Sequence, residues 1–501
     1  METKNTPSGD NLKWWILATV IIGTFLGRLD QSIVNLALPT IINDFGITVS
    51  AASWIATAYI IANAVFVPVW GKLGDTIGRK KVYMMGFSIF ILGSVLAGFA
   101  WNLNSMIVFR VIQAIASSAD YPTAMAIIAV TFKQGRERAQ ALGIWSASFA
   151  AASVFGPLLG GPLIDNFGWR SVFLINLPIG AFGIFMAAKY IHESVATKKE
   201  TSFDLFGALT LGVFLSSLVL VLDKGTEWGW MSLNSFIAYA VALSFILIFI
   251  LIERTHKEPL IDFKFFSNKL FMGAIVNNFL IFLAMMGAVF LIPLFAQTFL
   301  GYSATETGLL FIPMAFFMVL SAQIGGRTVG RIKSNYVVAL STLIAAIGLF
   351  LFAIMLDARS SAIDIIIPLS IFAFGMGLGM SQRTNAIASA VPQNEIGVAS
   401  GILALVRNIA GAFGIAIFTT LLTHSINNNV INISKNTIIH SIDPAVFKEV
   451  MALIILKAQI LAYSTNFLVA GVLVLIGAIL AFFVKMSKDD EDLKTTVHVE
   501  G

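Results

Sequence analysis

The sequence GKLGDTIGRKK, residues 71–81, separates two apolar runs at residues 51–70 and 82–100. Each run has about 20 residues, the length of an α-helix that crosses the hydrocarbon core of a bilayer. The eleven residues between them hold three glycines, one aspartate and four basic residues. This pattern predicts a tight, positively charged turn between two membrane-spanning helices.

Runs of the same kind continue in both directions from this turn. The chain has 501 residues, of which 57% are hydrophobic and 12% charged, whereas soluble domains average about 45–50% and about 25%. The first run lacks a small-x-small cleavage pattern, so we expect a retained helix. Fourteen runs predict an all-α membrane protein: residues 14–36, 51–70, 82–100, 104–130, 139–162, 170–190, 204–222, 235–252, 270–297, 304–325, 336–356, 362–380, 398–423 and 462–484.

The residue types needed for several other functions are missing or badly spaced. There is no cysteine, and the five histidines do not follow a metal-ligand spacing, so disulfides, thiolate sites and metal centres have no support. We find no phosphate-binding loop and no nucleophile–base pattern. We therefore expect a protein that is not an enzyme and that uses no cofactor or nucleic acid.

The distribution of basic residues predicts the orientation of the chain in the membrane. Alternate segments, beginning with the N-terminus, hold 23 of the 32 Lys and Arg residues, and Arg383 is counted among them. The opposite segments hold six, and Arg28, Arg110 and Arg407 fall inside the runs. Because cytoplasmic loops carry the excess of basic residues, we expect both termini in the cytoplasm.

The loop at residues 71–81 has a second copy. Residues 326–333 read GRTVGRIK, and Gly74 and Gly326 each lie four residues before a Gly-Arg pair. Duplicated halves around a central site are frequent in transporters. The repeat predicts two six-helix bundles with two helices inserted between them, with these boundaries: 1–195, 196–258, 259–485 and a cytoplasmic tail at 486–501.

One predicted outside segment is long, from about residue 425 to 461. Its first part is polar and its second part, DPAVFKEVMALIILK, is amphipathic. We expect a surface loop that contains a short helix lying at the lipid interface.

The loop at residues 71–81 resembles the signature loop of the major facilitator superfamily. A merely positive loop would explain its charges but not the spacing of its glycines and aspartate. The resemblance implies a conformational latch, formed by the following residues: Gly71, Gly74, Asp75, Gly78 and Arg79. In the second copy Arg327 stands where Asp75 stands in the first, so we expect any latch there to be degenerate.

Small residues in the fifth run resemble the antiporter motif of this superfamily, with Ala152 in place of one glycine: Gly143, Gly156, Pro157, Gly160 and Gly161. Small residues allow close helix packing, and proline bends a helix. Ordinary tight packing is the other interpretation. The resemblance favours export over uptake.

In the first run, residues 29–39 (LDQSIVNLALP) resemble the hallmark of the fourteen-helix drug:proton antiporters, with Ser32 where threonine is usual. A carboxylate within a membrane span is by default a functional candidate. Burial disfavours its charged form, so Asp30 can take up and release a proton. A fixed ion pair with Arg28 or Arg110 is the other interpretation.

The fourth run carries Arg110 and Gln113, which resemble the Arg-x-x-Gln-Gly motif of the superfamily, although Ala114 replaces its glycine. The resemblance implies that Arg110 assists proton transfer; a structural hydrogen bond is the other interpretation. Asp120 lies ten residues further on, about 15 Å along a helix, where the family has a small or apolar residue. We therefore predict a second carboxylate that binds the proton or a cationic substrate.

Further resemblances cover most of the chain and make Gln297 and Arg407 candidate cavity contacts. The family resemblance implies a monomeric, proton-coupled antiporter that exports lipophilic, cationic drugs across a bacterial cell membrane. Its partners would be a small-molecule substrate, protons and the lipid bilayer. A narrower exporter for a tetracycline-like compound, a bile acid or a lipid is the nearest alternative. A proton symporter and a non-transporting receptor are further ones.

Overall fold

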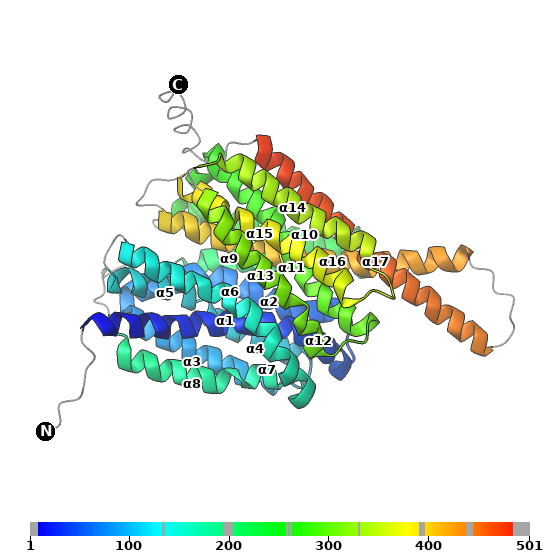
Figure 1. Cartoon of the computed structure of the whole chain (residues 1–501), viewed down its shortest axis with the longest axis horizontal. Helices are drawn as coiled ribbons and strands as arrows, with labels where there is room; N and C mark the ends of the chain where they lie inside the picture. Colours follow the sequence, from blue (N-terminus) through cyan, green and yellow to red (C-terminus); the bar gives the residue numbers. More distant parts are fainter. Residues whose placement is uncertain are drawn as a thin grey trace. The chain divides into compact units, whose positions relative to one another are not determined.

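The computed structural model describes residues 9–132, 136–193, 204–256, 259, 263–328, 331–389, 396–436 and 444–483. All the regular structure in this part of the chain is helical (Figure 1). The helices are α1 (Gly9–Phe45), α2 (Val49–Ile77), α3 (Arg79–Gly98), α4 (Leu103–Ser117), α5 (Asp120–Thr131), α6 (Arg136–Phe167), α7 (Ser171–Leu174), α8 (Asn176–Tyr190), α9 (Leu205–Trp228), α10 (Leu233–Thr255), the 3₁₀ helix η1 (Phe263–Ser267), α11 (Lys269–Phe299), α12 (Ala304–Leu309), α13 (Phe311–Thr328), α14 (Ser334–Met355), α15 (Ala362–Ser389), α16 (Ile396–Asn436) and α17 (Pro444–Phe483).

Twelve helical segments in the described residues are long and apolar enough to cross a membrane. The remaining two predicted spans correspond to α6, which has 32 residues, and to the pair α4 and α5. The predicted all-α membrane fold is therefore confirmed.

Three of the predicted spans are interrupted, which the sequence analysis did not anticipate. The breaks lie at residues 118–119, 175 and 310, between α4 and α5, α7 and α8, and α12 and α13. A proline follows each break: Pro122, Pro178 or Pro313. The residue four positions before that proline lies in the break or directly before it. Because proline has no N–H, the carbonyl of that residue receives no helical hydrogen bond.

Helix contacts divide the chain into two compact units, each with its own packing. Unit 1 comprises Met1–Ile47, Trp54–Phe214 and Leu243–Leu260, and unit 2 comprises Thr48–Ser53, Leu215–Ala242 and Ile261–Gly501. In unit 1, α1 packs on α6 and α8, and α3 packs on α4 and α8. In unit 2, α15 packs on α13 and α14, and α11 packs on α16 and α17. The domain boundaries expected from the repeat stay a prediction.

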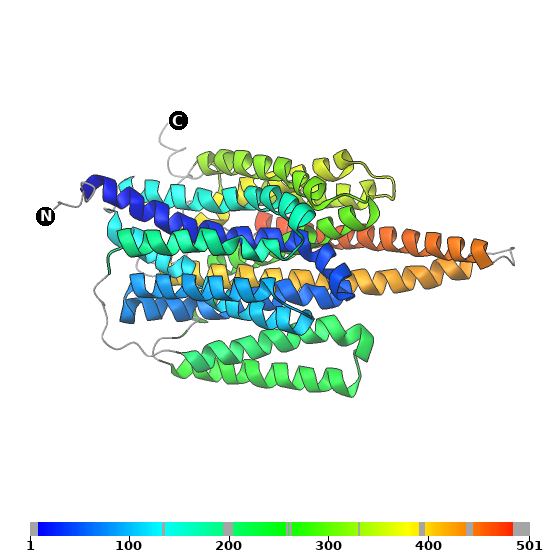
Figure 2. The ribbon, with the colours of Figure 1, turned by 90° about the horizontal axis from the view of Figure 1, so that it is seen from below.

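The outside segment at residues 425–461 is mostly helical, so the expected surface loop is wrong. α16 continues to Asn436 and α17 begins at Pro444. Figure 2 shows the two helices side by side as a long hairpin, and Asn429 Nδ2 donates to the Ala458 carbonyl across it (3.2 Å). Residues 437–443 at its tip lie outside the described part.

Arg383 is also placed differently from the prediction, which counted it with a cytoplasmic loop. α15 runs on to Ser389, and Arg383 is 2% exposed within it. The apolar run was predicted to end too early because Ser381, Gln382 and Arg383 interrupt its hydropathy.

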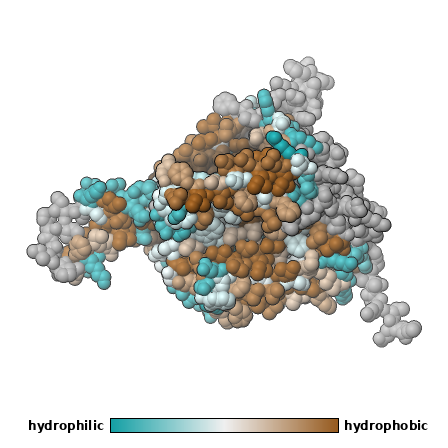
Figure 3. All heavy atoms as spheres, turned by 180° about the vertical axis from the view of Figure 1, so that it is seen from behind, coloured by the Kyte–Doolittle hydropathy of each residue, from teal (hydrophilic) through white to brown (hydrophobic). Residues whose placement is uncertain are grey.

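Large apolar side chains remain on the outer surface, as a lipid-facing protein requires. Figure 3 shows extended apolar areas on the described surface. On α10 they recur along the helix: Phe236, Ile237, Leu243, Leu247 and Leu251 are all more than half exposed. The sequence of α10 is apolar on all sides, which suits contact with lipid rather than with water.

Candidate functional site in unit 1

A buried ion pair lies in the core of unit 1. Arg110 Nη1 on α4 donates to Asp30 Oδ2 on α1 at 2.5 Å. The Asp30 side chain is 0% exposed and that of Arg110 is 2% exposed. Arg28, the other predicted partner, instead donates to Gln31 Oε1 (3.1 Å). Of the two interpretations of Asp30, the described geometry matches the ion pair with Arg110.

Two amides complete the coordination of Asp30. Asp30 Oδ1 accepts from Gln113 Nε2 and from Asn176 Nδ2, each at 2.9 Å. Asn176, at the start of α8, also donates to Ser94 Oγ on α3 (2.8 Å). Neither Asn176 nor Ser94 was predicted to belong to the site: Asn176 belonged only to the further family resemblances, and Ser94 gave no signal beyond being a polar residue inside an apolar run. Both carboxylate oxygens of Asp30 on α1 are thus held by fixed donors from two other helices, α4 and α8.

The guanidinium of Arg110 is held on its other side by α2 and α4. Its Cζ lies 4.0 Å from the centroid of the Tyr59 ring, and Nη1 also donates to Gln113 Oε1 (2.5 Å). A cation over a desolvated aromatic face gains about 2 kcal/mol. The Tyr59 hydroxyl in turn donates to Ser117 Oγ (2.7 Å).

Glycines of the predicted antiporter motif bring α6 against α1 next to Asp30. A Cβ on Gly156 would lie 2.4 Å from Ser32 Oγ, and one on Gly160 would lie 2.9 Å from Ile33 Cγ2. Pro157 lies between them within α6. Gly143 and Gly161 also lie in α6, but no close approach to α1 is described for either of them. The motif thus fixes the position of the residues that follow Asp30.

We expect Gly156→Leu to separate α1 from α6, because its side chain would overlap Ser32. Overpacking of this kind costs about 1–3 kcal/mol, which a lowered midpoint of thermal unfolding in detergent will report. Ile144→Phe, which adds bulk at a 48% exposed position of the same helix, is the control. Equal midpoints for the two variants would contradict the role of Gly156.

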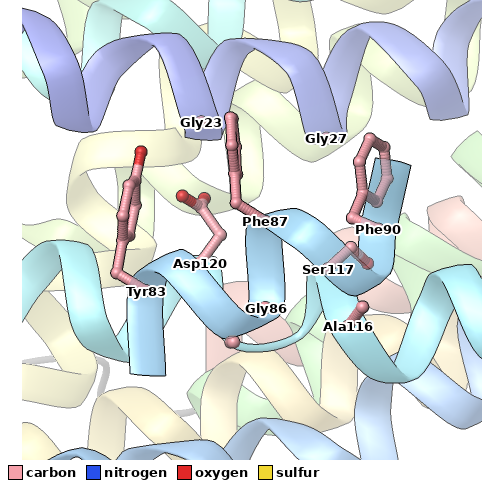
Figure 4. A pocket seen from close by; sticks show the side chains of 10 residues that line it. Gly23, Gly27, Tyr83, Gly86, Phe87, Phe90, Ala116, Ser117 and Asp120 are labelled. Atoms are coloured by element: carbon pink, nitrogen blue, oxygen red, sulfur yellow. The ribbon is translucent and has the colours of Figure 1, made fainter. Parts of the chain in front are cut away.

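Asp120 lies apart from this ion pair, at the start of α5, and its carboxyl group points into a narrow cavity (Figure 4). The cavity offers about 20 Å³ to the centre of a water molecule, which is room for about one water. Glycines create this space: a Cβ on Gly23 would lie 3.0 Å from Asp120 Oδ1 and 2.3 Å from the Tyr83 hydroxyl. Asp120 Oδ1 is buried and accepts no hydrogen bond from the residues that the structure describes, whereas Thr24 bonds to the carboxyl group.

The predicted latch loop is much shorter than expected: α2 continues to Ile77 and α3 begins at Arg79, so Gly78 alone lies between the two helices. Gly78 has φ = 103°, a conformation that residues with a Cβ rarely adopt. Arg79 Nη1 donates to the Ala126 carbonyl on α5 (3.1 Å). Gly71, Gly74 and Asp75 belong to α2, but the side chain of Asp75 lies outside the described side chains.

A carboxylate from the segment after α8 caps α3 at this loop. Glu193 accepts from the backbone N–H groups of Lys80 (3.1 Å) and Lys81 (3.2 Å), two of the unpaired donors at the helix N-terminus. A Cβ on Gly78 would lie 2.3 Å from Glu193 Oε1, so the glycine also makes room for the cap. Glu193 could not be predicted from the sequence, because its partners lie more than a hundred residues away.

We expect Glu193→Ala to loosen the first turn of α3. Loss of a helix cap costs about 1 kcal/mol, so the amides of Lys80 and Lys81 should exchange with solvent about fivefold faster. Hydrogen exchange followed by mass spectrometry measures this, and His192→Ala, at the exposed neighbouring position, is the control. Unchanged exchange at these amides would exclude the cap.

Two further candidates lie in unit 2. Arg407 on α16 donates through Nη2 to Asn278 Oδ1 (3.1 Å), and its Cζ lies 4.8 Å from the centroid of the Phe282 ring. Gln297 is half-buried near the end of α11. The described contacts do not bring Gln297 and Arg407 together.

Comparison with known proteins gives three consistent matches. The family model described as Major Facilitator Superfamily matches residues 20–415. The chain is 34% identical over 414 residues to the multidrug transporter protein MdtP of Bacillus subtilis (strain 168), covering 82% of this chain and 76% of MdtP. It is 32% identical over 401 residues to the multidrug resistance protein Stp of Mycobacterium tuberculosis (strain CDC 1551 / Oshkosh), covering 80% and 74%.

A solved structure shares the fold. A bacterial homolog of the human lysosomal transporter Spinster, in an inward-facing and unoccupied conformation, superposes with a TM-score of 0.66. The match covers 96% of this chain and 97% of that one at 17% sequence identity. At this identity the likeness concerns the arrangement of the helices alone.

Proposed function

Because this chain belongs to the major facilitator superfamily, we propose that it exports a range of lipophilic compounds from the cell in exchange for protons. Membership makes it a multi-pass transporter of the cell membrane with small-molecule substrates, and not an enzyme. Export of several drugs is proposed because MdtP and Stp, which match most of the chain, are named for multidrug transport and multidrug resistance. The antiporter motif in α6 supports the direction.

One observation is the main support for the proposed proton coupling. Asp120 has a buried oxygen without a hydrogen-bond donor, beside a cavity the size of a water molecule and within a predicted span. A proton on this oxygen would remove a charge from a medium in which charges are costly. Moving one charge across 100 mV yields about 2.3 kcal/mol, which is enough to drive export.

Asp30 has a different task in this proposal. Its oxygens already accept from Arg110, Gln113 and Asn176, so a proton there would displace a charged donor at a cost of several kcal/mol. We assign Asp30 and Arg110 to holding α1, α4 and α8 together. Asp120 exchanges the proton and favours substrates with a positive charge.

The remaining features follow the sequence predictions. We propose two six-helix bundles with α9 and α10 inserted between them, both termini in the cytoplasm, and a monomer as the working unit. The segment from Gly71 to Lys81, which comprises the end of α2 and the start of α3, serves as the conformational latch on the cytoplasmic side, with Glu193 capping α3.

Transport into inverted membrane vesicles tests the proposal. With an acidic lumen, we expect uptake of several unrelated lipophilic cations together with loss of the proton gradient. Uptake without proton movement for every transported compound would contradict the coupling. Transport of one compound from a broad panel would indicate the narrower exporter, and movement with the protons would indicate a symporter.

A further inference from the structure

The two units carry equivalent helix crossings, which allows their residues to be matched. Gly93 on α3 lies against the backbone of Gln113, where an added Cβ would come within 2.9 Å. Gly348 on α14 lies in the same way against the backbone of Phe372 on α15, at 2.5 Å. α14 and α15 are therefore the counterparts of α3 and of the α4–α5 pair.

Helix α1 of unit 1 and helix α11 of unit 2 can be matched through a proline that each contains. Pro39 is the internal proline of α1 and Pro293 that of α11, and each lies six residues before the end of its helix. Gly46 and Gly301, which follow the two helices, both have positive φ, at 61° and 66°. Counting back sixteen residues from each proline pairs Gly23 with Asn277.

This matching identifies the residues of unit 2 that correspond to the residues lining the Asp120 cavity in unit 1. The cavity-lining residues and their counterparts are Gly23 and Asn277, Gly86 and Ser341, Phe87 and Thr342, Ser117 and Met376, and Asp120 and Gly379. Asp120 itself thus has a glycine as its counterpart, so the second copy of the site has no carboxylate.

The guanidinium of Arg383 fills that second copy. Within the described part of the chain Arg383 has four acceptors, and all are at the matched positions: Asn277 Oδ1 (3.0 Å), Ser341 Oγ (3.1 Å), the Met376 carbonyl (3.1 Å) and Thr342 Oγ1 (3.2 Å). A Cβ on Gly379 would lie 2.6 Å from Arg383 Nη2. The charged group thus occupies the space in which the side chain of an aspartate would lie.

The two copies hold groups of opposite charge, a carboxyl group in unit 1 and a guanidinium in unit 2. In unit 1 the charged or titratable groups that act on Asp120 are Arg28 on α1 and Tyr83 on α3. In the described part of unit 2 no carboxylate bonds to Arg383, and the charged group that acts on it is Arg407 on α16. Arginine keeps its proton in proteins. The second copy therefore carries a fixed positive charge.

We propose that Arg383 closes the second copy of the proton site, so that the chain has a single site of this kind, at Asp120. The inference rests on the proposed function of Asp120 and refines it by limiting the number of exchanged protons. Arg383 is a positioning residue in this scheme. It holds α11, α14 and α15 together and leaves unit 2 without a group that can exchange a proton there.

Transplanting the residues of unit 1 into unit 2 tests this. The variant Ser341→Gly, Gly379→Asp, Arg383→Ala reproduces Gly86, Asp120 and Ala124, the counterparts in unit 1. Protons released by purified protein in detergent are counted with an indicator dye, on a jump from about pH 5 to about pH 9. We expect this variant to release about one proton per chain more than the wild type.

Two controls separate the inference from the proposed function. Ser341→Gly with Gly379→Asp keeps Arg383, which would pair with the new carboxylate, so we expect no additional proton. Asp120→Asn should release about one proton fewer than the wild type. A triple variant without an additional proton, or a double variant with one, overturns the inference. If Asp120→Asn releases as many protons as the wild type, the proposed function fails instead.

A second measurement does not depend on the folding of the triple variant. The chain has no cysteine, so Ser341→Cys introduces a single thiol beside the guanidinium. Because a neighbouring guanidinium favours the reactive thiolate, the rates are compared at a pH at which the thiol is ionised in both variants. There we expect a small thiol reagent to modify the thiol faster when Arg383→Ala is added, because the truncated side chain leaves the space open. Equal rates with and without Arg383 would show that its side chain does not close this space.

Discussion

Asp30→Ala is expected to lower the stability of unit 1 by about 3–5 kcal/mol, because it leaves the charge of Arg110 buried without a counter-ion. Arg110 is 1% exposed, and its contacts with Gln113 and Tyr59 are to neutral groups. Gln113 and Asn176 would also lose their acceptor. The midpoint of thermal unfolding in detergent measures the effect.

A paired variant shows whether the ion pair itself is responsible. Asp30→Asn with Arg110→Met removes both charges and keeps an acceptor for Gln113 and Asn176, so we expect a midpoint near that of the wild type. If the paired variant is as unstable as Asp30→Ala, the packing of the side chains matters and the charge does not. If Asp30→Ala unfolds like the wild type, Arg110 must reach another counter-ion.

Asp120→Asn is expected to abolish proton-driven export, to the rate of vesicles without the protein. Asparagine keeps the shape of the side chain but takes up no proton, so an imposed pH gradient no longer has a group to act on. Exchange of labelled for unlabelled substrate, which needs no proton movement, should persist. Uptake into inverted vesicles with and without a pH gradient measures both.

The matched control is Asp165→Asn, which changes an exposed carboxylate on α6 in the same unit. We expect it to respond to the pH gradient as the wild type does. An Asp120→Asn protein that still exports at the wild-type rate with proton movement would assign the coupling to another group. The loss of exchange as well as export would indicate that Asp120 serves substrate binding or folding.

The sequence alone determined the membrane fold and the family. The length of an apolar run, set against the thickness of the bilayer, identifies a spanning helix without knowledge of its neighbours. The glycines, aspartate and basic residues of the loop at 71–81 are likewise a local pattern, and so is the motif in α6. Each of these patterns is contained in a single segment, so it can be recognised without knowing how the rest of the chain packs.

The tertiary structure decided which polar groups meet. In the folded chain Asp30 pairs with Arg110 and not with Arg28, and Glu193 caps the N-terminus of α3. Arg383 is buried among the matched residues of unit 2. These pairings join residues that lie far apart in the sequence, and several helices must pack before any of them forms. Polar groups in an apolar interior must find partners, but which partner is within reach depends on the packing of the helices.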